Sequence, residues 1–216
     1  MTTTDNPAGV HLAGAPARYR PALDGVRAVA ILAVLEFHAG SRLPGGFLGV
    51  DVFFVLSGYL ITGLLLEERA ATGHIHLLNF WGRRARRLLP AVLLLLVVGA
   101  IVTARSAPTL TLSFRRADML STLFYYANWH FVGTGQSYFA AAAGASPFLH
   151  TWSLAIEEQF YLLWPLLLTG LLVLTRRRRA ALPALIAAGA GVSAVAMSTL
   201  YSPAHPLRSY YGTDTR

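Results

Sequence analysis

The stretch "RAVAILAVLEFHAG" (residues 27–40) has the apolar run of a membrane helix, yet it opens with an arginine and closes on a glutamate and a histidine. An ionisable group in the middle of a membrane helix costs about 3 kcal/mol on insertion scales, so such groups usually face protein and serve a function. At about 100° per residue, Arg27 and His38 lie within about 20° of each other and about 16 Å apart along the axis. Asp24 lies one turn before Arg27 on the same side, and Glu36 falls on the opposite face. The spacing therefore predicts a stripe of acid, guanidinium and imidazole along one helix face.

A purely structural alternative exists for this stripe. Arg27 can extend its guanidinium to the cytoplasmic interface while His38 ends the helix at the outer one. The spacing alone leaves both interpretations open, and the general rule for intramembrane ionisable groups favours a functional one.

The composition indicates a membrane protein. Of 216 residues, 55% are hydrophobic and 13% charged, with a mean hydropathy of +0.51. This leaves too little polar surface to cover a water-soluble globule of that size. The 18 basic residues are all arginines, grouped between apolar runs, a pattern typical of cytoplasmic loops and not of nucleic-acid binding. The absence of cysteine excludes disulfides, thiolate metal sites and thiol nucleophiles.

Five runs are long and apolar enough to be predicted as membrane spans: 23–40, 48–66, 88–104, 149–175 and 181–201. With five spans, the positive-inside rule places the three arginine clusters at residues 18–20, 83–87 and 176–179 in the cytoplasm. Arg105, Arg115 and Arg116 then lie outside, against the rule. A sixth, shorter segment, residues 118–133, would reverse that order if it spanned, so we expect it to be interfacial or re-entrant and buried in protein.

The sequence thus predicts an all-α fold, a polytopic transmembrane bundle of about five spanning helices plus one re-entrant or interfacial helix. Residues 1–20 have no apolar core of signal-peptide length, and we expect them to form a flexible cytosolic tail. The predicted location is the inner (plasma) membrane, with a cytoplasmic N-terminus.

The second span, "GGFLGVDVFFVLSGYLITGLLL" (residues 45–66), carries an acid into the membrane. Asp51, Gly58 and Thr62 share one helix face at i, i+7 and i+11. Small residues there permit close helix approach. Asp51 is either part of a polar site or a charge at the helix N-terminus beside a packing seam.

The stretch "FWGRRARRLLPA" (residues 80–91) has four arginines in five positions. Pro90 is expected at the first turn of the third span, with the arginines just ahead of it. They are either a topology anchor for anionic lipid headgroups or, as a cluster, a site that holds phosphates bidentately.

The predicted span with the most polar side chains begins with "FLHTWSLAIEEQFYLLWP" (residues 148–165). A helix would place five of its side chains on one face, each within about 60° of the first: His150, Ser153, Glu157, Tyr161 and Trp164. A buried glutamate near a histidine can orient the imidazole or shift its pKa. The histidines at 74 and 76 lack nearby further ligands, so no metal site is predicted.

Four stretches in this order resemble the membrane-bound acyltransferase-3 family, O-acetyltransferases of bacterial surface polysaccharides, peptidoglycan and lipids. They are "LDGVRAVAILAVLEFHAG", "GGFLGVDVFFVLSGYLI", "FWGRRARRLLPA" and "LHTWSLAIEEQFYLLWP". The resemblance implies that residues 21–216 are the N-terminal part of a membrane acyltransferase domain. It also implies an acyl-CoA co-substrate, acetyl-CoA above all, with no metal, and an extracytoplasmic carbohydrate or lipid hydroxyl as acceptor.

The resemblance also assigns roles to residues. His38 is implied as the catalytic histidine, with Arg27, Asp51 and Glu157 beside it. Arg84 and Arg87 match the Arg-x-x-Arg pattern at the cytoplasmic face, where CoA phosphates are expected to bind. Supporting or substrate-contacting positions are Asp24, His150, Trp152, Ser153, Gln159 and Tyr161.

Two alternatives remain at the sequence level. The same His, Glu and Asp groups could relay protons in a proton-coupled transporter. The chain could also be a non-catalytic interaction protein or an inactive truncated fragment of the acyltransferase.

Overall fold

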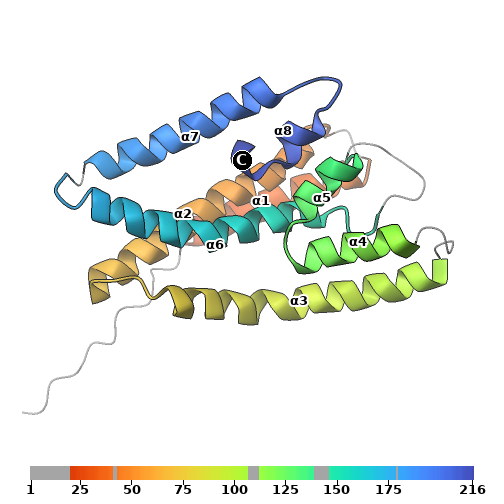
Figure 1. The fold of residues 1–216 in the computed structure, drawn as a ribbon, viewed down its shortest axis with the longest axis horizontal. Helices are drawn as coiled ribbons and strands as arrows, with labels where there is room; N and C mark the ends of the chain where they lie inside the picture. The colour runs from red at the N-terminus through yellow and green to blue at the C-terminus, as the bar shows by residue number, and fades with distance from the viewer. Residues whose placement is uncertain (1–19, 41–42, 107–111, 139–145, 179) are drawn as a thin grey trace, which may run out of the picture.

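The computed structural model describes residues 20–40, 43–106, 112–138, 146–178 and 180–216. The predicted cytosolic tail lies outside these ranges except for Arg20. All regular elements within them are helical: α1 (Pro21–His38), η1 (Gly46–Leu48), α2 (Gly49–Thr72), α3 (Leu77–Ser106), α4 (Leu112–Leu123), α5 (Ala127–Thr134), α6 (Thr151–Leu174), α7 (Ala181–Leu200), α8 (Leu207–Tyr211) and η3 (Thr213–Thr215). The long helices lie lengthwise beside one another (Figure 1). The predicted all-α membrane bundle is confirmed.

Four helical segments among the described residues have the length and apolarity to cross a membrane: Gly46–Thr72, Leu77–Arg105, Thr151–Leu174 and Ala181–Leu200. They correspond to the second to fifth predicted spans. α1, the first, packs along α2 but carries Asp24, Arg27 and Glu36 within its 18 residues. The total of five spans stays a prediction.

The connection between the second and third predicted spans is mostly helical. α2 continues to Thr72 and ends at Gly73, whose φ of 81° suits a glycine. α3 already begins at Leu77, so Pro90 lies inside the helix and its prediction at the first turn is wrong. Proline removes only one helical hydrogen bond, which a membrane helix tolerates. The arginines at 83–87 are therefore fixed on a helix surface.

The segment predicted as interfacial or re-entrant forms two short helices, α4 and α5. Tyr125, with a φ of 55°, interrupts the helical conformation between them. Neither helix belongs to the four that could span, and both pack on α6. Their buried residues include polar ones, such as Thr122 and Asn128, which agrees with a segment enclosed in protein.

α6 is the central helix of the bundle. It runs between α7 on one side and α3 on the other (Figure 1), and it also contacts α2, α4, α5 and α8. Trp152 at its beginning and Leu168 near its end are 1% and 0% exposed. Polar side chains on α6 therefore lie where other helices can supply partners, as α2 does for Glu157.

α1 is approached closely by two glycines, Gly46 of η1 and Gly49 at the start of α2. A Cβ atom on Gly46 or Gly49 would overlap the backbone carbonyl oxygens of Ala33 and Ala30 in α1. Small residues at such contacts let helix backbones pack without intervening side chains. This contact holds the helix that bears His38 against the bundle.

Replacing Gly49 by valine should therefore destabilise the bundle, because a side chain there pushes α1 away. We expect the melting temperature in detergent to fall by about 5 °C. It is measured from the fraction of protein recovered by size-exclusion chromatography after heating. Gly63→Ala on the same helix is the matched control, since nothing lies within 4 Å of a Cβ atom there. An equal fall for both variants would contradict the close contact.

Candidate active site

His38 stands at the end of α1 with both ring nitrogens engaged. Nδ1 lies 2.7 Å from the carbonyl oxygen of Val34, and Nε2 lies 2.8 Å from the hydroxyl of Tyr138. A nitrogen beside a carbonyl oxygen must be the donor, so the neutral ring carries its proton on Nδ1. The Nε2 lone pair then accepts the hydrogen bond from Tyr138.

An aromatic cluster surrounds this imidazole, made of His38, Tyr138, His150, Trp152 and Tyr210. The ring centres of His38 and His150 are 5.0 Å apart, and Tyr138 stacks on Tyr210 at 6.0 Å. Trp152 lies 4.8 Å from Tyr210 between ring centres. The cluster joins α1, the segment after α5, the beginning of α6 and α8.

Burial and charge set the protonation states in the aromatic cluster. Burial raises the pKa of the Tyr138 phenol above its usual 10.0, so the hydroxyl keeps its proton at neutral pH. Burial, and then the positive charge of a protonated His38, lower the pKa of His150 below its usual 6.5. His150 is thus a neutral neighbour of His38 at pH 7.

A second polar group lies further along α6. Ser57 on α2 donates a hydrogen bond of 2.6 Å to Oε1 of Glu157, and the hydroxyl of Tyr161 donates to the same oxygen. Arg84 on α3 stacks over the Tyr161 ring, with its guanidinium carbon 4.1 Å from the ring centre. Three helices thus meet through Glu157 and Tyr161.

The aromatic cluster and the Glu157 group occupy the predicted polar face of α6. From His150 to Tyr161 is eleven residues, or about 16 Å along the helix. Between them lies a cavity of about 220 Å³ whose walls include Val34 of α1, Ser153 and Glu157. The cavity therefore reaches the polar face of α6 at Ser153 and Glu157.

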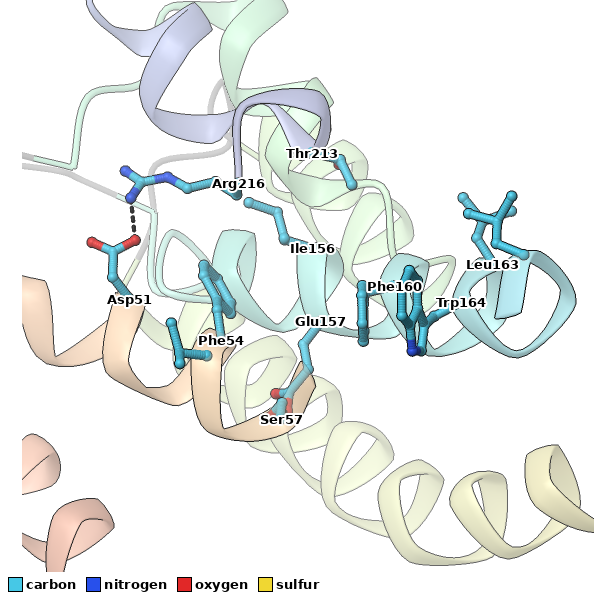
Figure 2. A pocket seen from close by; sticks show the side chains of 12 residues that line it. Asp51, Phe54, Ser57, Ile156, Glu157, Phe160, Leu163, Trp164, Thr213 and Arg216 are labelled. Atoms are coloured by element: carbon cyan, nitrogen blue, oxygen red, sulfur yellow. Dashed lines mark hydrogen bonds and ion pairs between the residues drawn. The ribbon is translucent and has the colours of Figure 1, made fainter. Parts of the chain in front are cut away.

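A larger cavity of about 350 Å³ lies on another side of Glu157 (Figure 2). In Figure 2 the side chains of Ser57 and Glu157 meet at one edge, and Asp51 and Arg216 form an ion pair at the other. The Arg216 guanidinium also lies 4.8 Å from the centre of the Tyr210 ring. Asp51 thus connects the second span to the aromatic cluster.

The acids that the resemblance implies at the site of His38 have other partners in the structure. Asp24 pairs with Arg27 at 3.2 Å, and both side chains keep 40% or more of their surface exposed. Asp51 pairs with Arg216, and Glu157 with Ser57 and Tyr161. Within the described ranges, Val34 and Tyr138 are the hydrogen-bonding partners of the His38 ring.

The remaining predicted residues fall in several places. Ser153 donates to the carbonyl oxygen of His150 at 3.3 Å, and Gln159 donates to Asn128 at 2.9 Å. Arg87 is exposed on α3. The described part of the chain contains no group of three or more His, Asp or Glu side chains arranged to hold a metal ion.

Sequence reasoning missed Ser57, Tyr138 and Tyr210 as site residues. Each is far along the chain from its partner: 100 residues separate both Ser57 from Glu157 and Tyr138 from His38. No helical spacing connects such pairs. For Ser57 alone the sequence offers an indication, since it is a polar residue inside an apolar span.

Comparisons with known proteins identify the family. The family model of the acyltransferase domain of the acyltransferase-3 family matches residues 20–206, so the chain belongs to this family. The chain is 45% identical over 201 residues to the peptidoglycan O-acetyltransferase OatA of Listeria monocytogenes. It is 46% identical over 205 residues to the putative peptidoglycan O-acetyltransferase YrhL of Bacillus subtilis, and 43% over 204 to the O-acetyltransferase OatA of Staphylococcus aureus.

These alignments cover most of the chain but only part of the relatives. Each covers 92% of the chain, and 32%, 31% and 33% of the three relatives. The chain therefore spans about a third of the length of the curated relatives it matches. No solved structure matches it.

The low pKa of His150 predicts an acid-sensitive fold. The folded state disfavours the charged imidazole, so His150 destabilises the fold as pH drops below its usual pKa of 6.5. Between pH 7.5 and pH 5 the melting temperature of the parent should fall more than that of His150→Asn. An equal acid-induced fall in both proteins would contradict this assignment.

Proposed function

We propose that the protein is an integral membrane O-acyltransferase that moves an acetyl group from cytosolic acetyl-CoA to a hydroxyl of an extracytoplasmic carbohydrate, peptidoglycan foremost. Family membership and the peptidoglycan O-acetyltransferases among the relatives support this class of reaction. The observation that carries the proposal is the line of polar groups on α6, which joins His38 at one end to Arg84 at the other. The bundle belongs in the bacterial plasma membrane, with Arg84 towards the cytoplasm.

The donor end of this line is the arginine face of α3. A guanidinium binds phosphate oxygens bidentately, and Arg84 is held in one position by the Tyr161 ring. Arg87 lies on the same helix, exposed, and is free to contact a second phosphate. From this end the extended pantetheine arm of CoA can cover the distance of about 16 Å to the aromatic cluster.

At the acceptor end, His38 acts as general base through Tyr138. The acceptor hydroxyl gives its proton to the Tyr138 oxygen as the phenol proton passes to Nε2 of His38. The hydroxyl oxygen then bonds to the thioester carbonyl carbon, and the carbon–sulfur bond breaks. The sulfur leaves as a thiol with the proton that the imidazolium returns. The product is an O-acetyl ester, and no redox change occurs.

Replacing His38 by alanine in the whole protein should lower acetylation of envelope glycans at least about 100-fold, because the proton acceptor is lost. Mass spectrometry of isolated glycans measures the O-acetyl content, and membrane fractionation checks insertion. The exposed His205 provides the matched control, and His205→Ala should acetylate normally. Retained acetylation by His38→Ala, or proton-coupled solute flux without acetyl transfer, would contradict the proposal.

The donor site predicts a difference between neighbouring arginines. Arg84→Gln should raise the KM for acetyl-CoA about tenfold in proteoliposomes, because it removes the ordered phosphate ligand. Arg86→Gln removes an equally basic but exposed side chain of the same helix, and its KM should stay within about twofold of the parent value. The same increase in both variants would indicate only a loss of general positive charge.

A further inference from the structure

A buried carboxylate lies outside the acyl-transfer line, at the junction of α4 and α5. Asp118 is 1% exposed. Its Oδ1 accepts hydrogen bonds from Nε2 of His130 at 2.8 Å and from the side-chain amide of Gln136 at 3.2 Å. Its Oδ2 faces Arg115 at 3.4 Å. Burying a carboxylate is unfavourable unless donors surround it, and here they come from α4, α5 and the segment after α5.

Gln136 is the point where this network meets the aromatic cluster. Its backbone N–H donates to the carbonyl oxygen of Phe131 at 3.2 Å, and its own carbonyl accepts from the hydroxyl of Tyr211 on α8 at 3.2 Å. Its side chain reaches both Asp118 and Thr134. Main chain and side chain of Gln136 are thus both fixed, two residues before Tyr138.

The position of Tyr138 depends on that fixed point. Stacking against Phe37 and Tyr210 sets the plane of the phenol ring, but stacked rings slide at little cost. The 2.8 Å hydrogen bond to His38 requires that the phenol ring also be fixed in position within that plane. Tyr138 lies outside the helices, so the anchoring of Gln136 supplies the restraint that a helix would otherwise give.

We propose that Asp118 is a positioning residue for acyl transfer, which acts through Gln136 to hold the Tyr138 hydroxyl against Nε2 of His38. This rests on the proposed function, in which Tyr138 relays the proton. His130 and Arg115 already supply donors to the Asp118 carboxylate, and the third donor comes from the segment that carries Tyr138. The network therefore extends beyond what pairing of α4 with α5 requires.

The placement of Asp118 also determines which kinetic constant responds. Asp118 belongs to α4, and the proposed donor site on α3 contacts Tyr161, about 16 Å along α6 from the aromatic cluster. Loss of the network should slow the proton transfer without weakening acetyl-CoA binding. A misplaced reacting group lowers turnover by about ten- to a hundredfold.

The test is a double-mutant cycle in the whole protein, reconstituted in proteoliposomes with radiolabelled acetyl-CoA and chitopentaose as acceptor. Asp118→Asn, Gln136→Ala and Tyr138→Phe should each lower kcat about tenfold, with the KM for acetyl-CoA unchanged. In the Tyr138→Phe background the other two substitutions should cause no further loss, because their effect passes through Tyr138. Asp214→Asn, at the exposed ion pair with Arg208, is the matched control and should stay within about twofold of the parent.

Losses that multiply in the double variants would overturn the inference and leave Asp118 with a stabilising role alone. An unaffected Tyr138→Phe would overturn it as well, because Asp118 would then have nothing to position. Gln136→Ala leaves Asp118 paired with His130 and Arg115. If Asp118→Asn does not fold, the double-mutant cycle is therefore measured with Gln136→Ala and Tyr138→Phe. Failure of the proposed function is distinguished by His38→Ala, which then retains transfer.

Discussion

The hydrogen-bonded carboxylate of Glu157 is the constraint on which the arrangement of the bundle depends. A charged or polar side chain in the middle of a membrane helix must find donors within the protein. Ser57 of α2 and Tyr161 of α6 provide them. Meeting this requirement sets the register of α2 against α6, and the Tyr161 ring then sets the position of Arg84 on α3.

From this centre the polar face of α6 continues towards the aromatic cluster. Gly46 of η1 and Gly49 of α2 let α1 pack closely, which places His38 near the beginning of α6. In the aromatic cluster the neighbours of the His38 imidazole are mainly aromatic rings, those of Tyr138, Trp152 and Tyr210. The result is a histidine with one nitrogen fixed by its own helix and the other facing a phenol. The His38 ring is therefore oriented by a carbonyl oxygen and a phenol among the described residues.

The parts of the site that sequence reasoning anticipated share one property, which is that they repeat with the helical period. The pairing of Asp24 with Arg27 and the common face of His150, Glu157 and Tyr161 follow from spacing alone. The partners of Asp51 and His38 could not be deduced that way, because Arg216 and Tyr138 are 165 and 100 residues away. The prediction for the start of α3 is wrong because Pro90, expected in the first turn, lies inside the helix.

The sequence by itself determined the membrane character of the chain, its all-helical class, the polar faces of the helices and, through motifs, its resemblance to the acyltransferase-3 family. These are local properties, since hydropathy and periodicity depend on neighbouring residues. Only the tertiary structure decided which polar groups meet: Ser57 with Glu157, Tyr138 with His38, and Gln136 with Asp118. The reason is that helix periodicity fixes the direction of a side chain but not the neighbour it faces. That neighbour is determined by the packing of the helices and by the cost of leaving buried polar groups unpaired.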